Sequence, residues 1–446
     1  MQNYLAIKKT KFAALVSAMC FSSVVGAADL YEVIDLGPIE SSFSEAFSIN
    51  DSNTVVGTAN GDDFLNRAYM YQNGQAEFLS YIPYSFDIGE ITYEGHSLAF
   101  DINNLDVIVG SSGEVVSITE IVDGEEETTD YTIDSAVVFD QLNQSYIRIP
   151  KVETIIPRDS KALAVNDNNL AVGYVNVDNT DEDTSSIFLT RGFFYNIDNE
   201  TLTIIDPINT EQPNNLVLRD INESGTAVGI TSDIVDERGV TQVLVVDVSN
   251  PDVVEIKEIF GGAQQHSWAI NDSNKIVGKA LDEDNRAFHG FVYDSSTQTA
   301  TSLGFLNENS QFSEAFDINN SDQIVGMSQF QNSPSVVYHA FLYENGVMRD
   351  LNKLIGCNSE WILNEARSIN DFDSGFNSGV ITGAGLLNGE KRAFMLMPVA
   401  GSTPDCSAVD DDSGGSGSIP WFGLSFLLSL IFITRSKLIS SNIECG

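Results

Sequence analysis

Carboxylates are the most abundant groups in this sequence that could do chemistry. The chain of 446 residues has 64 Asp and Glu against 22 Lys and Arg, and only four histidines. Two carboxylates at a suitable separation can hydrolyse glycosides, and clustered carboxylate oxygens can bind Ca²⁺. None of the three acidic clusters, at residues 123–127, 178–183 and 282–284, has the spacing of an EF-hand loop, so a solvated surface is the favoured interpretation and a Ca²⁺ cofactor the alternative. The candidate Ca²⁺ ligands are Asp178, Asp181, Asp183, Asp282 and Asp284.

Sequence motifs of the better-known hydrolases and nucleotide-binding proteins are missing from the chain. It has no G-x-S-x-G for a serine nucleophile, no HExxH for zinc and no Walker A sequence for phosphate. We interpret the scattered histidines, His96, His266, His289 and His339, as ordinary strand-end residues. The net charge of −42 leaves no basic surface for a nucleic acid, so none is expected as a partner. The sequence thus identifies no catalytic residue.

Only two cysteines lie in the part of the chain that we expect to remain after processing. Cys20 and Cys445 lie in terminal segments, whereas Cys357 and Cys406 lie between them. In an oxidising compartment such a pair can form a disulfide. The sequence therefore predicts a Cys357–Cys406 bridge between the last repeat and the segment that follows it.

A short sequence motif is repeated seven times along most of the chain. An Ile-Asn or Val-Asn pair is followed, after a short polar segment, by a Val-Gly pair, and the seventh copy ends in Thr-Gly instead. In six of the seven copies the Asn and the Gly are seven residues apart. Self-similarity of this kind is typical of repeat folds. The repeated residues are Asn50, Asn103, Asn166, Asn222, Asn271, Asn319 and Asn370, with Gly57, Gly110, Gly173, Gly229, Gly278, Gly326 and Gly383.

Each copy has the pattern of four short strands. In the sixth copy, alternating residues predict strands at 313–319, 323–327, 339–343 and 347–351, with an Asn-Gly hairpin turn before the last. Four antiparallel strands per unit of about 50 residues are typical of a β-propeller blade. A further strand-like segment, 31–36, precedes the first copy, and the seventh copy ends after its third strand. We predict an all-β, seven-bladed β-propeller of four-stranded repeats over residues 29–400, closed by this N-terminal strand; a β-solenoid would lack that pairing.

The repeated residues have structural interpretations. An Asn after an apolar strand is typical of a turn, where it tolerates the left-handed conformation and bonds nearby backbone groups. The repeated Gly predicts a bulge or a close backbone approach near the axis. An insertion in the second copy, 111–134, contains an Asp-Gly turn and several glutamates, which predicts a protruding acidic hairpin.

The two ends of the chain have the composition of targeting segments. Residues 1–28 contain Lys8, Lys9 and Lys11, a short apolar run and small residues at its end, which is typical of a secretory signal peptide. Residues 401–418 are rich in Gly, Ser and Asp and predict a flexible stalk. Residues 419–434 predict one transmembrane helix, and the positive-inside rule places the short basic tail, 435–446, in the cytoplasm.

This tail resembles the GlyGly-CTERM sorting signals of Gram-negative bacteria. The resemblance rests on Gly414, Gly415 and Ser416, the apolar helix, and the basic residues Arg435 and Lys437. It implies the export machinery and a rhombosortase-like protease as partners. It also implies export across the inner membrane to the cell surface or the medium, with a C-terminal membrane anchor before processing. An ordinary anchor without sorting is the alternative.

The repeat resembles the HAF family of bacterial extracellular repeats. The His-Ala-Phe phrase at 339–341 carries the resemblance in full, and residues 392–394 and 67–69 match it in part. The resemblance implies export and a repeat fold but no defined reaction. The sequence therefore favours a non-enzymatic binding or envelope-interaction module with a polysaccharide or surface protein as ligand. A secreted carbohydrate-active enzyme and a structural surface-layer component are the alternatives.

Overall fold

The computed structural model describes residues 30–37, 43–61, 65–83, 85–88, 91–122, 125–141, 143–179, 188–205, 215–235, 238–331, 334–371 and 379–399. These residues all lie in the first of two compact units, Met1–Pro404. The predicted signal peptide, stalk, transmembrane helix and basic tail lie outside the described residues and stay predictions. Among the residues described, no helix is long and apolar enough to cross a membrane.

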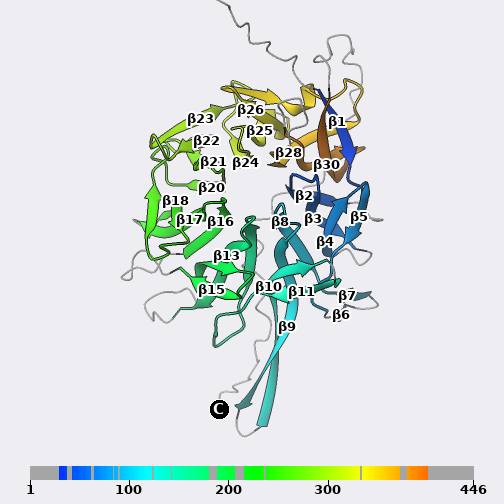
Figure 1. The fold of residues 1–446 in the computed structure, drawn as a ribbon, viewed down its shortest axis with the longest axis vertical. Coiled ribbons are helices and arrows are strands. Elements are labelled where there is room, and N and C mark those ends of the chain that lie inside the picture. Colours follow the sequence, from blue (N-terminus) through cyan, green and yellow to red (C-terminus); the bar gives the residue numbers. More distant parts are fainter. Residues whose placement is uncertain are drawn as a thin grey trace, which may run out of the picture. The chain divides into compact units, whose positions relative to one another are not determined.

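Seven four-stranded antiparallel sheets are arranged as blades around a central axis (Figure 1). In six of the blades the strands are paired in the order of the sequence. The first strands of neighbouring blades contact one another around the axis. This arrangement confirms the predicted fold class, a seven-bladed propeller of four-stranded repeats.

The strands follow the repeat closely, and each blade begins with the strand that ends at a repeated asparagine. Blades one to three consist of β2 (Ser44–Ile49), β3 (Val55–Asn60), β4 (Asn66–Gln72) and β5 (Gln75–Phe78); β8 (Ser97–Ile102), β9 (Ile108–Val122), β10 (Glu125–Asp140) and β11 (Ser145–Arg148); and β12 (Ser160–Val165), β13 (Leu170–Asp178), β14 (Phe188–Asn196) and β15 (Thr201–Ile204). Blades four and five consist of β16 (Asn215–Ile221), β17 (Thr226–Val235), β18 (Arg238–Asp247) and β19 (Val254–Lys257); and β20 (Gln265–Ile270), β21 (Lys275–Leu281), β22 (Phe288–Asp294) and β23 (Thr299–Gly304). Blades six and seven consist of β24 (Ser313–Ile318), β25 (Ile324–Gln331), β26 (Val337–Glu344) and β27 (Val347–Asp350), with the short helix η1 (Leu351–Lys353); and β28 (Trp361–Ile369), β29 (Ile381–Leu387), β30 (Glu390–Val399) and β1 (Leu30–Asp35).

The N-terminal strand closes the ring, as the sequence predicts. β1 pairs antiparallel with β30, from Leu30 opposite Val399 to Asp35 opposite Phe394. It supplies the fourth strand of a blade whose other three strands come from the end of the repeat region. The Arg392 guanidinium lies 2.9 Å from the Asp35 carboxylate and adds an ion pair across the junction. Because the two ends of the repeat region share one sheet, the ring opens only if that sheet separates.

The repeated glycines lie where two strands come together at a bulge. In every blade the first strand has an extra residue opposite the second strand, as between Ala315 and Asp317 in blade six. A Cβ atom on Gly326 would overlap the carbonyl oxygen of Glu314, and the other six glycines meet the equivalent oxygen in their own blades. Only glycine fits this approach, so the predicted bulge is confirmed.

The repeated asparagines cap turns and also join blades. Each Oδ1 accepts hydrogen bonds within its own turn; that of Asn166, for example, accepts from the N–H groups of Asn168 and Leu170. Each Nδ2 donates to the main-chain carbonyl of the equivalent asparagine in the next blade, at 2.9–3.2 Å. Asn370 donates to Asn50 and so completes a closed ring of seven bonds. In the six copies where the structure describes it, the residue three positions later adopts the left-handed conformation instead of the asparagine.

The residue after each repeated asparagine forms a second ring. Its main-chain N–H donates to a side-chain oxygen of the equivalent residue in the next blade, at 2.7–3.0 Å. We call this end of the axis, where the first strands end, the turn face, and the opposite end, where they begin, the start face. The second ring consists of Asp51, Asn104, Asp167, Glu223, Asp272, Asn320 and Asp371.

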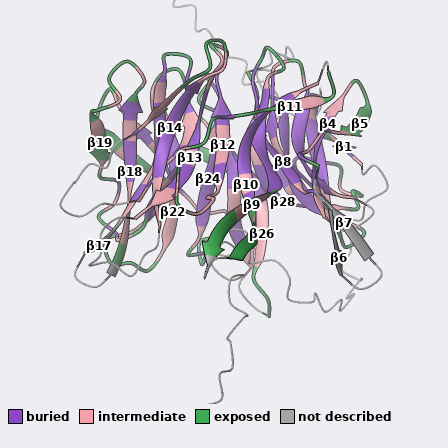
Figure 2. Ribbon diagram, turned by 90° about the horizontal axis from the view of Figure 1, so that it is seen from below, coloured by how far each residue is buried: buried purple, intermediate pink, exposed green. Residues whose placement is uncertain are grey.

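Apolar side chains fill the spaces between the blades. The described residues form seven apolar clusters, one between each neighbouring pair of blades. Between blades five and six, for example, Val277 and Leu303 pack against Ile324 and Phe341. Figure 2 shows the buried parts of the strands in purple, packed side by side through the ring. Burial of apolar surface is the main stabilising term, and the hydrogen-bonded rings set the position of each blade.

The second blade carries the predicted protruding hairpin. β9 and β10 pair as far as Val122 and Glu125, and the hairpin extends past the ring in Figure 1. Its residues 125–130 are exposed, and Ser117 donates to the Asp130 carboxylate across the two strands at 2.6 Å. The chain between blades one and two forms a two-stranded sheet that the sequence analysis did not predict, β6 (Ser85–Ile88) paired with β7 (Ile91–Glu94).

The asparagine ring predicts a specific loss of stability when its donor is removed. Asn271→Asp keeps the Oδ1 acceptor but replaces Nδ2, which lies 3.2 Å from the Asn319 carbonyl oxygen, by an oxygen that cannot donate. We expect the free energy of unfolding of the full chain, measured in urea, to fall by about 1–3 kcal/mol, the cost of a buried hydrogen bond left unmade. Asn345→Asp, in an exposed hairpin turn, is the matched control. An equal loss in both variants would contradict the proposed role of the ring.

Candidate functional site

The structure places a basic group beside each predicted Ca²⁺ ligand that it describes. The Asp178 carboxylate lies 2.9 Å from the Arg158 guanidinium. Asp282 accepts a hydrogen bond from the main-chain N–H of Arg286 at 2.7 Å and lies 4.0 Å from His289 Nε2, and the Asp284 carboxylate lies 3.9 Å from the Arg286 side chain. Within the described ranges, no group of three or more Asp, Glu, His or Cys side chains is placed to hold a metal ion. The two remaining candidates, which lie outside the described residues, are Asp181 and Asp183.

Cys357 forms a disulfide bond. Its predicted partner, Cys406, lies outside the described residues, so the pairing of these two cysteines stays a prediction. The residues of the predicted sorting signal also lie outside them: Gly414, Gly415, Ser416, Arg435 and Lys437.

The His-Ala-Phe motif at 339–341 connects the two outer strands of blade six. His339 Nδ1 and the Asp350 carboxylate are 3.0 Å apart, which joins the third strand of blade six to the end of the fourth. The Phe330 ring stacks on the imidazole with centroids 4.1 Å apart. Arg392 and Asp35 form the equivalent pair in blade seven. These contacts fit the interpretation of His339 as a structural residue.

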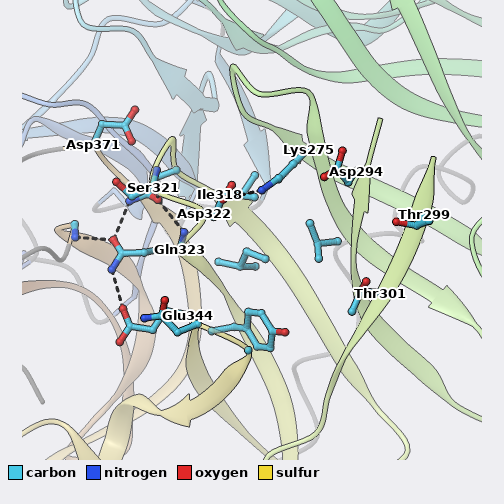
Figure 3. A pocket seen from close by; sticks show the side chains of 17 residues that line it. Lys275, Asp294, Thr299, Thr301, Ile318, Ser321, Asp322, Gln323, Glu344 and Asp371 are labelled. Atoms are coloured by element: carbon cyan, nitrogen blue, oxygen red, sulfur yellow. Dashed lines mark hydrogen bonds and ion pairs between the residues drawn. The ribbon is translucent and has the colours of Figure 1, made fainter. Parts of the chain in front are cut away.

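A pocket of about 750 Å³ opens between blades five and six on the turn face (Figure 3). The Lys275 ammonium and the Asp322 carboxylate form an ion pair of 2.6 Å beside it. Gln323 donates to Glu344 at 3.0 Å and accepts from the N–H of Gly379 at 3.1 Å. The polar groups that line the pocket thus bond to one another, and we interpret it as a solvated gap between blades rather than a binding site.

Three aspartates of alternate blades lie on the first strands, two residues before the repeated asparagine. Asp101, Asp220 and Asp317 each accept a hydrogen bond from a main-chain N–H of the next blade, at 2.7–2.8 Å. Burial raises the pKa of Asp220 to about 8 and the pKa values of Asp101 and Asp317 to about 6, and neighbouring carboxylates add to each shift. Raised pKa values also occur at active sites. Here the carboxyl groups join blades, so we assign them a structural role.

Cationic and aromatic side chains of blades four to six converge between the start face and the middle of the axis. Arg219 on β16 lies over the indole of Trp268 on β20, with its Cζ 4.0 Å from the ring centroid. Trp268 Nε1 donates to the carboxylate of Glu314 on β24 at 2.7 Å. Lys279 on β21 forms an ion pair of 2.9 Å with the same carboxylate, and Glu314 is only 3% exposed. These contacts form one continuous chain across three blades.

Three half-buried aromatic rings border this chain of contacts. The Lys279 ammonium lies 5.4 Å from the ring centroids of both Phe288 and Phe312. Phe312 contacts Phe288 at 5.9 Å and Tyr338 at 5.4 Å, in both cases edge to face. All three rings lie at or just before the starts of strands on the start face. We call the following seven residues the mouth cluster: Arg219, Trp268, Lys279, Phe288, Phe312, Glu314 and Tyr338.

The sequence analysis did not identify the mouth cluster, although one signal for it was present. The bulge releases the residue three positions before each repeated asparagine from regular pairing. That residue is large in every copy, but its type varies (Phe in three copies, Arg in two, Leu and Trp in one each) in a repeat whose Asn and Gly do not vary. These residues are Phe47, Phe100, Leu163, Arg219, Trp268, Phe316 and Arg367.

A sequence family described as "Protein of unknown function (DUF3466)" matches residues 40–214 and 159–308, which together cover more than half of the chain. The chain belongs to the DUF3466 family. No curated protein matches this DUF3466 chain.

Several solved structures resemble this DUF3466 protein at low identity. A puromycin-hydrolysing peptidase of Mycobacterium tuberculosis has a TM-score of 0.41 at 8% identity, over 81% of this chain and 61% of the peptidase. An acylaminoacyl peptidase of Pyrococcus horikoshii has 0.44 at 10% identity, over 80% and 52%. An oligogalacturonate lyase of Vibrio parahaemolyticus has 0.42 at 10% identity, over 83% and 97%. The chain thus covers little more than half of either peptidase, and likenesses at this level give no argument about its activity.

The three axial aspartates predict how stability depends on pH. The folded chain binds their protons more tightly than the unfolded chain, in which the pKa of Asp is about 3.9, so stability falls as pH rises from about 4 through about 8. Asp220→Asn removes the group with the largest shift. Between about pH 6 and 9 we expect its free energy of unfolding to decline less steeply than that of wild type, by up to about 1.4 kcal/mol per pH unit.

Urea unfolding of the full chain at a series of pH values measures this difference in slope. Asp220→Asn also loses one acceptor for a main-chain N–H, which changes stability at every pH but does not change the slope. Asp252→Asn, at an exposed turn, is the matched control. Parallel profiles for wild type and Asp220→Asn would show that Asp220 does not titrate in this range.

Proposed function

We propose that this DUF3466 protein is an exported, surface-displayed or secreted binding module whose ligand is a polysaccharide bound at the mouth cluster. The observation that carries the proposal is the meeting of three half-buried aromatic rings with a lysine and a buried glutamate at the start face. Aromatic rings offer rigid apolar surface, and a few placed polar groups fix the orientation of a ligand. A sugar presents C–H faces bordered by hydroxyl groups, which suits both kinds of contact.

The glutamates in and near the mouth cluster are better suited to binding a ligand than to hydrolysing a glycoside. Glu314 is held in an ion pair with Lys279. Burial opposes ionisation of Glu365, but Arg367 and Lys391 outweigh it and lower its pKa. A general acid in glycoside hydrolysis needs a raised pKa, so that it has a proton to give. Glutamates held in ion pairs are suited to positioning a ligand.

Export is supported by several independent features. Residues 1–28 have the pattern of a signal peptide, and the tail has the residues of a GlyGly-CTERM signal. Cys357 is disulfide-bonded, and structural disulfides are expected outside the reducing cytoplasm. The large excess of acidic residues keeps a secreted protein soluble and separate from its neighbours.

The proposal predicts that polysaccharide binding needs the aromatic rings of the mouth cluster. On a glycan array the full chain should bind at least one polysaccharide, and Phe312→Ala should weaken that binding about tenfold, since ring contacts of this kind contribute about 1 kcal/mol or more. Tyr146→Ala, which removes a ring beneath Arg148 on the outer strand β11, is the matched control and should bind as wild type does. An array without any bound glycan, or unchanged binding by Phe312→Ala, would exclude this function for the mouth cluster.

A further inference from the structure

Arg219 lacks the carboxylate partner that six other arginines of the described chain have. Within the described residues it forms neither an ion pair nor a side-chain hydrogen bond, and its buried Nε has no acceptor. In a chain with 64 acidic residues, an arginine without a carboxylate partner calls for an explanation. The arginines that form ion pairs with carboxylates are Arg148, Arg158, Arg286, Arg349, Arg367 and Arg392.

The position of Arg219 leaves its terminal N–H groups available to a ligand, whereas Nε is buried. It lies at the bulge of β16, next to the axis, and its side chain is partly exposed. Its guanidinium lies over the Trp268 indole, 4.0 Å from the ring centroid. This cation–π contact uses the charge of the guanidinium and none of its N–H donors. Trp268 thus holds the group in place without satisfying its donors.

The charge of Arg219 is incompletely neutralised by the protein. Burial lowers its pKa to about 10, so the guanidinium is still cationic at neutral pH. The nearby Glu314 is already bonded to Lys279 and Trp268. The adjacent Asp220 accepts from the N–H groups of two isoleucines, in its own blade and in the next. The carboxylates closest to Arg219 are therefore committed to other partners.

His266 adds a second unsatisfied group at the same place. Burial, together with the charges of Arg219 and Lys279, lowers the pKa of His266 to about 3, so its imidazole is neutral. Its Nε2 lies 3.3 Å from the Thr241 hydroxyl oxygen, whereas its buried Nδ1 has no partner among the described residues. Arg219 and His266 Nδ1 are thus two neighbouring polar groups without partners among the described residues. Such groups are typical of a subsite that binds a polar ligand.

We propose that Arg219 binds an oxyanion carried by the ligand, a carboxylate or sulfate group of an acidic polysaccharide. A guanidinium binds such groups through two parallel N–H···O bonds, which gives orientation as well as affinity. The aromatic rings of the mouth cluster hold the sugar, and Arg219 selects sugars that bear a negative charge. This inference rests on the proposed polysaccharide function and narrows it to acidic polymers.

Trp268 allows this contact to be measured directly. The chain has three tryptophans, so Trp361→Phe and Trp421→Phe in the full chain leave Trp268 as the only one. We would titrate this protein with glucuronate, its methyl ester, glucose and glucose 6-sulfate and follow the indole fluorescence. Glucuronate or glucose 6-sulfate should bind with a Kd at least tenfold below those of the ester and glucose, and added NaCl should weaken the binding. The tighter of the two anions identifies the oxyanion.

Arg219→Met should abolish this preference, so that anionic and neutral sugars bind alike. The fold should survive, because Arg219 has no ion-pair partner among the described residues that its loss would leave as an uncompensated charge, and urea unfolding checks this. Arg286→Met removes the same charge from a side chain that is 76% exposed on the start face, and it should keep the preference.

A preference that survives in Arg219→Met, or that is missing from the parent protein, would overturn the inference. If the parent protein binds neutral and anionic sugars equally while the glycan array is positive, the polysaccharide function stands and the role of Arg219 fails. If no sugar binds and the array is blank, both fail.

Discussion

The side-chain amide of the repeated asparagine is the interaction on which the rest of the structure depends. Its oxygen caps the turn of its own blade, and its nitrogen donates to the main-chain carbonyl of the next blade. A single planar group therefore fixes one turn relative to its neighbour. The apolar clusters bring the blades together, but apolar contact has no direction. The amide bonds supply that direction, and the bond from Asn370 to Asn50 returns the ring to its start.

This framework separates the positions that build the ring from those that can carry function. Asn and Gly are required by backbone geometry in every copy, because one supplies two opposite hydrogen-bonding groups and the other avoids an overlap with a carbonyl oxygen. The backbone geometry does not require a particular residue at the bulge, because that residue has no partner in the register of the first strand. Arg219 and Trp268 occupy that position in consecutive blades. A binding site can thus be built beside the axis without altering the bonds between blades.

The sequence predicted the parts of the structure that follow from periodicity. Seven copies, an Asn-to-Gly spacing that is constant in six of them and a strand-like segment before the first copy together favour one fold, a propeller closed by that segment. The structure confirms the propeller and its closure by β1. Periodicity gives the position of a residue in its repeat, but it does not show which residue of the adjacent blade that residue contacts. The hydrogen bond between asparagines of adjacent blades was therefore not predicted. The mouth cluster was missed for the same reason. Arg219, Trp268 and Glu314 belong to three different copies and meet only in the folded ring, and a sequence cannot show that an arginine lacks a partner among the described residues.

Hydrogen exchange of the asparagine side-chain amides tests the central claim most directly. Nuclear magnetic resonance of the full chain, labelled with ¹⁵N at asparagine, resolves the Nδ2 protons. The seven repeated asparagines are only 3–5% exposed and donate to the next blade, so we expect their Nδ2 protons to exchange orders of magnitude more slowly than those of the exposed Asn345. Seven slow amides would establish the ring in solution. Exchange as fast as that of Asn345 would contradict the account, because the asparagine amides would then not hold one blade to the next.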